Sequence, residues 1–247
     1  METSPVILSD VDRAVRTLPE LSMKAGFKVE AFNLVLIKPN ICGLYHPSLD
    51  LLRSVVRFLE PYSDEIIIGE TESMIHSPDE QFERLGVNRL LEEMGGRIRT
   101  SDLSREPLVE VNVPKPHVLE RLRLPRLLLD ADLLVNVPKV GSHSTTVLTC
   151  ALKNLFGLLP QKRKYSLYHP LGMDNVIADI AQVVKPDLNV VDAGVKVLVG
   201  TDALATDIAA SRHIGLNPLR IKHLRLVAED RGAELQDLMR SVPLIEV

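Results

Sequence analysis

Short, almost wholly apolar runs recur along this chain, and helical patterns lie between them. Four of these runs have the length and apolar content of a strand buried on both faces. They cover residues 34–37, 65–69, 133–137 and 188–191. The main helical patterns cover residues 11–21, 49–59, 79–94, 173–184, 203–214 and 218–231. Because strands that alternate with helices favour a parallel sheet, the sequence predicts an α/β fold, with a mostly parallel sheet covered by helices on both faces.

The region 97–125 breaks this alternation, since prolines punctuate it and it contains no clear helical pattern. Val109, Val111 and Val113 are separated by single polar residues, a pattern typical of a half-exposed strand. We therefore expect a small antiparallel extension of the fold near residues 97–125.

Length and composition narrow the class of protein. A chain of 247 residues without an internal repeat is long enough for one substantial core, so we expect a single α/β domain over residues 1–247. No apolar run approaches the roughly 18 residues of a membrane-spanning helix, and the first residues lack the features of a signal peptide. The net charge of -4 argues against a nucleic-acid-binding protein. These features predict a cytoplasmic protein with neither a membrane nor a nucleic acid as its partner.

The two cysteines, Cys42 and Cys150, are too few for a four-thiolate zinc or iron–sulfur site. Cys150 falls in the middle of a predicted helix and is most simply a small buried apolar residue. We therefore expect no iron–sulfur cluster in this chain.

The segment 136–157 combines the end of a strand, a polar turn and a helical pattern. Ser144 has the residue type of a helix N-cap and Gly157 that of a helix end, so we predict a helix between them. In open α/β sheets, ligands bind beyond the carboxyl ends of the strands, often at the N-terminus of the next helix, where backbone N–H groups favour anions. The residues predicted to line such an anion site are Lys139, His143, Ser144 and Thr145.

Helical spacing divides this segment further. Thr145, Thr149 and Lys153 are four residues apart and would share one helix face. At about 1.5 Å per residue, Lys153 would lie about 12 Å along the axis from Thr145, too far for one small anion to touch both. Either the ligand is extended, or Lys153 and Asn154 act together with the following loop. A solvated lysine near a helix end is the alternative for Lys153.

Polar residues also follow the other predicted strands. They are Lys38, Asn40, Glu70, Glu72 and Asp192. If the strands are parallel, these residues share one edge of the sheet, although strand ends are commonly polar because loops are solvated. Lys38, which precedes a proline and is held extended, is a candidate ligand-binding residue, as is Asn40. For Glu70 and Glu72 we favour an interaction with a helix dipole over a metal.

The loop 158–171 carries both basic and aromatic residues. They are Lys162, Arg163, Lys164, Tyr165, Tyr168 and His169. Such a loop can close as a lid over an anionic substrate, or can be no more than a solvated surface. His143 and His169 are candidate acid–base groups, because histidine titrates near neutral pH.

Two aspartates in the last third of the chain are candidate metal ligands, Asp192 at a strand end and Asp207 inside a helix. Asp207 lies next to the apolar residues Leu204 and Ile208, where a carboxylate needs a partner, and a buried structural hydrogen bond is favoured over a cation. Asp202, at the start of the same helix, is the predicted N-cap.

Three strings occur along the chain in a specific order: LIKPN, then ADLLVNVPKVGSHSTTVLTCALKNLFGLLPQKRKYSLYHP, then TDALATDIAASRHIG. In this order they resemble the domain of unknown function 362 family, over roughly residues 34–215. Many members of that family carry ferredoxin-like cysteine clusters, which this chain lacks, and an electron-transfer role is weakened accordingly. The segment AGVKVLVG that follows Asp192 is also shorter than in similar members, which would alter any pocket that it shapes.

Together these features predict a protein that binds a small anionic ligand, bearing a phosphate or a carboxylate, with a divalent metal as a candidate cofactor. The predicted ligand-binding residues are Lys38, Asn40, Ser144, Thr145, Lys153, Asn154 and Lys164. The predicted proton-transfer residues are His143, His169 and Lys139, and the candidate metal ligands are Asp192 and Asp207. An enzyme is the favoured class. The alternative is a non-catalytic accessory or binding protein for a metallocofactor or an iron–sulfur redox partner, and a homodimer is also compatible with the sequence.

Overall fold

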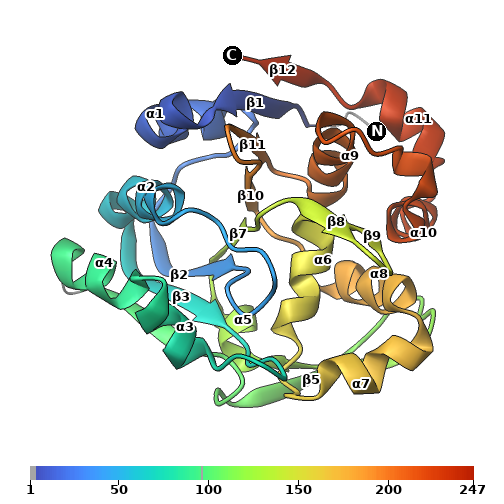
Figure 1. Ribbon diagram of the computed structural model, residues 1–247, viewed down its shortest axis with the longest axis horizontal. Helices are drawn as coiled ribbons and strands as arrows, with labels where there is room; N and C mark the ends of the chain where they lie inside the picture. Colours follow the sequence, from blue (N-terminus) through green and yellow to red (C-terminus); the bar gives the residue numbers. More distant parts are fainter. Residues whose placement is uncertain (1–3, 96) are drawn as a thin grey trace.

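An eight-stranded sheet crosses the molecule and separates two layers of helices (Figure 1). The computed structural model describes residues 4–95 and 97–247. The strands of this sheet lie in the order β12-β1-β11-β10-β7-β2-β3-β4. Their bounds are β1 (Val6–Asp10), β2 (Phe32–Pro39), β3 (Ser63–Glu70), β4 (Ile98–Asp102), β7 (Leu133–Val137), β10 (Leu188–Asp192), β11 (Lys196–Gly200) and β12 (Leu244–Glu246).

The sheet is mostly parallel, as predicted. Strand β11 runs antiparallel to its two neighbours β1 and β10, and the remaining neighbours pair in parallel. From β2 the chain moves outwards through β3 to β4, whereas from β7 it moves the other way through β10 to β11. The order therefore reverses between β2 and β7. In open α/β sheets such a switch point is where ligands bind, beyond the carboxyl ends of the strands.

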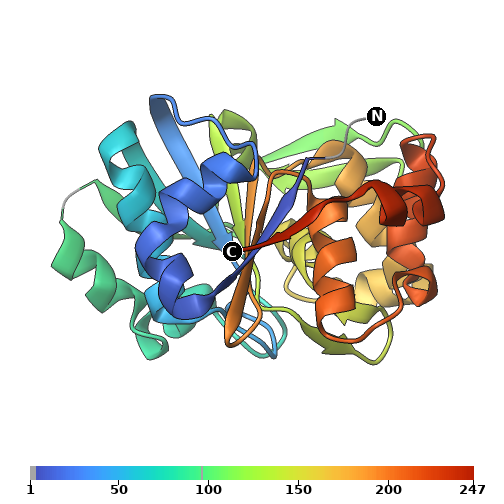
Figure 2. The same cartoon turned by 90° about the horizontal axis from the view of Figure 1, so that it is seen from above.

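Helices cover both faces of the sheet (Figure 2). One face carries α1 (Val11–Lys24), α2 (Leu49–Leu59), α3 (Pro78–Arg84) and α4 (Val87–Met94). The other carries α6 (Ala151–Leu155), α8 (Met173–Val183), α9 (Ala203–His213), α10 (Lys222–Asp230) and α11 (Leu235–Ser241). Strand β2 shows why both layers form: Val35 and Ile37 pack into the core on the α2 side, and Leu36 between them packs into the core on the α8 side.

Helix boundaries follow local chemistry. The predicted N-cap Asp202 is confirmed, since its Oδ1 accepts a hydrogen bond from Ala205 N at 2.8 Å. Ser48 caps α2 in the same way, and its Oγ accepts a hydrogen bond from Leu51 N at 3.3 Å. The pattern predicted as one helix over residues 79–94 forms two, α3 and α4, because Gly86 adopts a φ of 77° between them. Within the part of the chain that the structure describes, no helix has both the length and the apolar character needed to cross a bilayer.

Two antiparallel strand pairs lie outside the main sheet. Strands β5 (Leu108–Asn112) and β6 (Arg121–Pro125) pair with each other and confirm an antiparallel extension. The extension is narrower than residues 97–125, because β4 joins the main sheet in parallel with β3. The second pair, β8 (Gly141–His143) and β9 (Val147–Thr149), was not predicted.

The prediction of a helix from Ser144 to Gly157 is wrong over its first half. The hairpin β8–β9 occupies residues 141–149, and α6 begins only at Ala151. The reason is a run of β-branched residues at 145–147, which lose side-chain freedom in a helix and favour extended structure. The shared helix face of Thr145, Thr149 and Lys153 therefore does not exist.

The hairpin is strained, and its strain lies next to the start of α6. Val147 has a φ of 65°, in the left-handed region that β-branched residues rarely adopt. Cys150, predicted to lie mid-helix, occupies the N-cap position of α6 and is buried, as expected for a small apolar residue.

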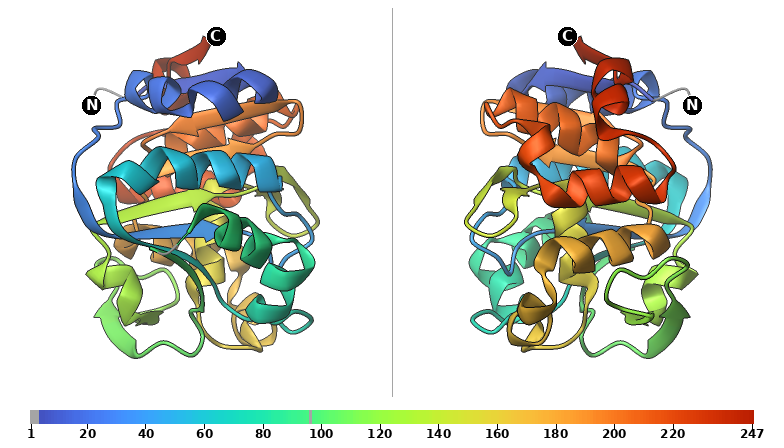
Figure 3. Two further views of the ribbon diagram at one scale, coloured as in Figure 1. Left: turned by 90° about the vertical axis from the view of Figure 1, so that its left-hand side faces the viewer. Right: turned by 90° about the vertical axis from the view of Figure 1, so that its right-hand side faces the viewer.

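The remaining differences lie in connections and at the end of the chain. The loop 158–171 contains a short helix, α7 (Lys164–Tyr168), followed by a 3-10 turn, and α5 (Arg126–Asp130) precedes β7. The last strand, β12, pairs in parallel with β1 beside the first helix (Figure 3). Strand β11, helix α11 and β12 were not predicted. The run of residues 197–199 in β11 is apolar and fully buried, so its pattern does indicate a strand, whereas β12 has three residues and is exposed.

Candidate functional site

Lys38 lies at the switch point, at the carboxyl end of β2, where it forms a buried ion pair. Its Nζ lies 2.7 Å from Glu70 Oε1 of β3, and the two side chains are 1% and 3% exposed. The ammonium also donates to Pro39 O at 2.7 Å and to Asn154 Oδ1 at 3.2 Å. Glu70 accepts further hydrogen bonds from the backbone N–H groups of Ile41 and Thr71. Lys38 is therefore fully paired within the protein.

This arrangement corrects the role expected for Glu70. The helix that follows it begins only at Pro78, so Glu70 does not lie near a helix N-terminus. It neutralises Lys38 instead, a contact between two strand ends that the sequence pattern does not show. Glu72 lies 3.5 Å from Lys162, at a more exposed position.

A row of buried amides attaches α6 to the sheet. Asn154 Nδ2 donates to Lys38 O at 3.0 Å and to Asn136 Oδ1 of β7 at 2.7 Å. Asn136 Nδ2 in turn donates to Asn189 Oδ1 of β10 at 2.9 Å and to Ala151 O at 3.0 Å. Asn154, predicted to bind ligand, is thus part of a closed network. Asn136 and Asn189 were missed, although each is a polar residue inside an otherwise apolar strand.

Lys164 fastens the connection between α6 and α8 to the sheet. Its Nζ donates a hydrogen bond to Thr71 Oγ1, and the Thr71 hydroxyl donates to Gly157 O. The side chain is buried, and this burial lowers the pKa of Lys164 to about 8. The loop predicted as a lid is therefore anchored at this end.

Lys139 and Asn40, also predicted to be site residues, are held by the protein. Lys139 Nζ lies 2.7 Å from Asp192 Oδ1, and Asn40 Oδ1 accepts a hydrogen bond from Lys139 N at 2.9 Å. Asp192 also accepts from the backbone N–H groups of Ser48 and Gly194, each at 2.8 Å. This pairing joins the ends of β7 and β10 and occupies the Lys139 ammonium.

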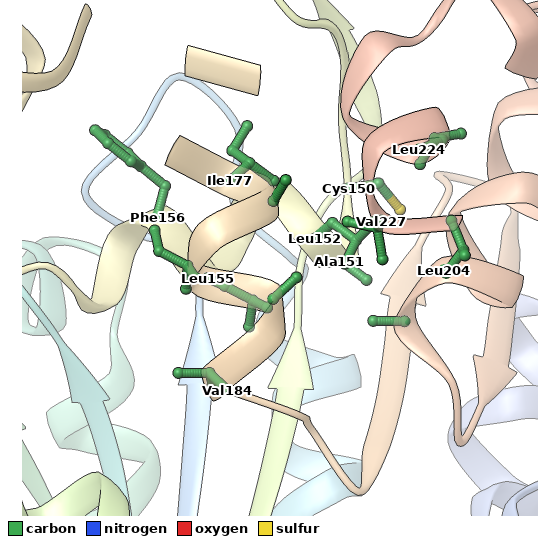
Figure 4. Close-up of a cluster of buried hydrophobic side chains, with 14 of the residues drawn as sticks. Cys150, Ala151, Leu152, Leu155, Phe156, Ile177, Val184, Leu204, Leu224 and Val227 are labelled. Carbon is green, nitrogen blue, oxygen red and sulfur yellow. The ribbon is translucent and has the colours of Figure 1, made fainter. Parts of the chain in front are cut away.

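Asp207 caps α6 from a neighbouring helix. Its two carboxylate oxygens accept hydrogen bonds from Ala151 N at 2.7 Å and Leu152 N at 3.0 Å. This confirms the buried structural hydrogen bonds favoured for Asp207. Burial raises the pKa of Asp207 to about 6, against the opposing effect of its hydrogen-bond donors. Leu152 and Leu155 of α6 pack among Ile177 of α8 and Val227 of α10, which fixes the helix (Figure 4).

The two candidate metal ligands do not meet. Asp192 holds Lys139, and Asp207 caps α6, so each carboxylate has a separate structural role. Among residues 4–95 and 97–247, no three His, Cys, Asp or Glu side chains converge as a metal site would need.

The two candidate histidines do come together, at the turn of the β8–β9 hairpin. His143 Nδ1 accepts hydrogen bonds from Thr145 N at 3.2 Å and Thr146 N at 3.3 Å. His169 Nε2 lies 3.4 Å from Thr145 Oγ1, and the ring of Tyr165 packs against that of His169 with 4.5 Å between centroids and a tilt of 32°. Ser144 is exposed beside them and caps no helix.

His143 is held neutral by its surroundings. Burial, then the positive charges of Lys153 and His169, lower the pKa of His143 to about 4. Since Nδ1 accepts two N–H donors, the proton of the neutral ring lies on Nε2. Nε2 of His143 is therefore a hydrogen-bond donor available to a ligand.

Lys153, on α6, faces the same place. Burial lowers the pKa of Lys153 to about 8, and the charge of Asp174 opposes this. Asp174 is itself held by His223, whose Nδ1 lies 2.7 Å from Asp174 Oδ1. Within the described part of the chain Lys153 makes no hydrogen bond or ion pair, and its ammonium is not fully buried.

We call the group formed by Lys153, His143, Thr145, His169 and Asp174 the Lys153 cluster. It brings a cation without a partner, a neutral imidazole with a free donor, a second imidazole and a hydroxyl to one place. Such a set can bind an anion and move a proton on it. The Asp174–His223 pair was not predicted, because nothing in the sequence relates two residues on separate helices.

A cavity of about 310 Å³ lies elsewhere, near the amino ends of the strands. Leu152 is part of its wall, together with Asp187 and the ion-paired residues Asp202 and Arg231. None of the residues predicted from the sequence to bind ligand lines it.

Comparison with known proteins identifies relatives of this chain. A family model described as "Domain of unknown function (DUF362)" matches residues 35–212. The chain is also 25% identical over 194 residues to the thylakoid-associated protein sll1697 of Synechocystis sp.. That match covers 72% of this chain and 57% of the relative, so the chain spans less than two thirds of the relative's length.

Two solved structures are similar over most of this chain at low sequence identity. One is a crystal structure of a Thermotoga maritima protein from the Northeast Structural Genomics Consortium, with a TM-score of 0.48, 15% identity, and coverage of 88% of this chain and 58% of the other. The second is the lactate racemase apoprotein from Thermoanaerobacterium thermosaccharolyticum, with a TM-score of 0.46, 16% identity, and coverage of 80% and 54%.

Proposed function

The chain belongs to the DUF362 family, and we propose that it binds a small anionic molecule at the Lys153 cluster. The anion is one that bears a carboxylate or a phosphate. Its negative group lies against the Lys153 ammonium, and the Nε2–H of His143 and the hydroxyl of Thr145 donate hydrogen bonds to it.

The observation that supports this proposal is the unpaired state of Lys153. The other buried or partly buried lysines each have a partner: Glu70 for Lys38, Asp192 for Lys139, Thr71 for Lys164, and Asp10 and Glu246 for Lys196. Lys153 has none in the described residues. Removing a charge from water without a counter-charge costs free energy, so an anion that supplies the counter-charge is stabilised there.

The proposal moves the anion site from the place where the sequence predicted it. Lys139 and Ser144 do not take part, because Lys139 is ion-paired and Ser144 does not begin a helix. His143, Thr145, Lys153 and His169 remain from the predicted set. His169 is the proposed proton-transfer group, since it lies next to Thr145 without a carboxylate partner among the described residues.

Calorimetric titration with pyruvate, malonate and inorganic phosphate tests this proposal. We expect at least one of them to bind the wild-type protein, and binding to be lost in Lys153→Ala. Lys162→Ala is the matched control, because the Lys162 side chain is 65% exposed and lies outside the cluster. Equal affinity of the wild type and a folded Lys153→Ala variant, checked by circular dichroism, would contradict the proposal.

The pH dependence provides a second readout. If the charged form of Lys153 binds the anion, affinity is highest well below pH 8 and decreases as pH rises through about 8, where Lys153 loses its proton. Above that pH the affinity falls about tenfold per pH unit. A dissociation constant that is independent of pH between 6 and 10 would mean that a different group holds the anion.

Catalysis and simple binding are distinguished by proton exchange. A protein that moves protons on its ligand should exchange the C–H hydrogens next to the carbonyl group of pyruvate in heavy water, as NMR can follow. The His169→Ala variant should bind the anion but exchange more slowly. Binding without exchange by the wild type would favour the alternative, a non-catalytic binding protein.

A further inference from the structure

We propose that Lys153 forms an imine with the carbonyl carbon of a small anionic aldehyde or ketone. The inference rests on the proposed function, because the same cluster would hold the anionic part of this substrate. It adds a substrate class and a covalent bond to simple anion binding.

The position of Lys153 suits a nucleophile. Helix α6 is fixed at its start by the two hydrogen bonds to Asp207, and the neighbours of Lys153 on either side, Leu152 and Asn154, are buried and packed or hydrogen-bonded. The backbone that carries Lys153 therefore cannot move far. Its amine is nevertheless free of any partner in the described residues and retains contact with solvent. Attack on a bound carbonyl requires a nucleophilic amine that is free of hydrogen bonds and is carried by a rigid backbone, as Lys153 is.

The surroundings of Lys153 also favour its neutral amine, which is the nucleophilic form. A lysine removed from water loses its proton more readily, and burial brings the pKa of Lys153 to about 8. About one molecule in ten then carries the neutral amine at pH 7. Asp174 on α8 and His143 on the hairpin interact electrostatically with Lys153, and His169 after α7 interacts with His143. Of these groups, Asp174 favours the charged form of Lys153.

The reaction balances without a further reagent. The lone pair of the amine attacks the carbonyl carbon, a C–N bond forms, and the oxygen takes a proton to give a carbinolamine. His169 then donates a proton to the hydroxyl, which leaves as water while the C=N bond forms. Amine and carbonyl compound thus give imine and water, with no oxidation or reduction. The protonated imine keeps a positive charge beside the anionic group, so the ion pair that holds the ligand is preserved.

Lys164, in the connection that follows α6, provides an internal comparison. Burial lowers its pKa to about 8 as well. Its Nζ, however, is hydrogen-bonded to Thr71 Oγ1, and the residue is only 7% exposed. A depressed pKa alone therefore does not select a lysine here, and accessibility of the amine distinguishes Lys153 from Lys164.

Reductive trapping tests the inference. The full chain is incubated separately with pyruvate, glyoxylate and glyceraldehyde phosphate, treated with sodium borohydride, and analysed by intact mass and peptide mapping. We expect one adduct per chain on the peptide that contains Lys153, which for pyruvate has the mass of pyruvate less one oxygen atom. Lys153→Arg, which keeps a positive charge and the fold, should lose the adduct. Lys164→Arg should retain it.

The outcomes separate this inference from the proposed function. Anion binding by calorimetry without an adduct from any of the three compounds would overturn the imine and leave anion binding in place. An adduct that persists in Lys153→Arg would overturn the assignment to Lys153. Absence of both binding and adduct in the wild type would overturn the two proposals together.

Discussion

Asp207 offers the sharpest test of the forces that hold the site, because two effects on its carboxyl group oppose each other. The residue is 0% exposed, which disfavours its charge, while two backbone N–H groups at 2.7 and 3.0 Å favour it. Burial is the larger effect and raises the pKa of Asp207 from 3.8 to about 6. At 1.36 kcal/mol per pKa unit, this shift corresponds to about 3 kcal/mol.

The sign of the effect on stability follows from proton binding. Below pH 3.8 the carboxyl group is protonated in both the folded and the unfolded chain. The contribution of Asp207 to the free energy of unfolding is then at its largest. Between pH 3.8 and about 6 the folded chain retains a proton that the unfolded chain has lost. The contribution of Asp207 to the free energy of unfolding therefore decreases by about 3 kcal/mol as pH rises through this window.

Comparison with Asp207→Asn isolates this contribution. Urea unfolding followed by circular dichroism gives the free energy of unfolding of both proteins at each pH from 4 to 8. The difference, wild type minus variant, should fall by about 2.4 kcal/mol over this range, because the rest of the change lies below pH 4 and other titrating groups largely cancel. Asp237→Asn, at a side chain that is 72% exposed, is the matched control for changing a carboxylate to an amide. A difference for Asp207→Asn that is flat, or that rises with pH, would refute the reasoning, since the hydrogen-bond donors would then outweigh burial.

Two further predictions concern the backbone around the site. Gly157→Ala should lower the free energy of unfolding by about 1–3 kcal/mol. The added Cβ would lie 2.8 Å from Nζ of Lys38, and the ion pair with Glu70 holds this Nζ in place. Unchanged or higher stability in urea unfolding would mean that Lys38 does not pack against Gly157. The second prediction concerns Val147, whose φ is 65°. The Val147→Gly variant should be about 1 kcal/mol more stable than Val147→Ala, because only glycine adopts this conformation without strain. If Val147→Ala were the more stable variant, the backbone of the hairpin would not be strained at this position.

Much of the fold could be predicted from apolar periodicity. The runs around Leu36, Leu134 and Val190 became parallel strands, since each is long enough and apolar enough to be buried on both faces. The hairpin after β7 could not be predicted in the same way. Ser144 resembles a helix cap and Gly157 a helix end, but the β-branched residues between them and the distant carboxylate of Asp207 decide that the helix begins at Ala151.

The residues of the candidate site were easier to identify from the sequence than their arrangement. His143, Lys153 and His169 were identified as candidates from residue type and local context, and they lie together. Lys38 and Lys139 were indistinguishable from Lys153 by the same criteria. Whether a lysine has a carboxylate partner depends on strands that are far apart in the sequence. Among the buried and partly buried lysines of the described chain, Lys153 alone has no partner, and only the folded structure shows this.

The position of β1 between two strands from the end of the chain has a consequence for how the protein is synthesised. Strand β1, whose residues Val6 and Ile7 are fully buried, has β11 and β12 as its neighbours in the sheet. At roughly 5–20 residues per second, the roughly 190 residues between Asp10 and Gly200 take on the order of ten to forty seconds to be synthesised. During this time the apolar strand β1 has neither of its partner strands. Strand β1 thus leaves the ribosome long before either of its neighbours in the sheet, and it is a segment that a chaperone would have reason to hold.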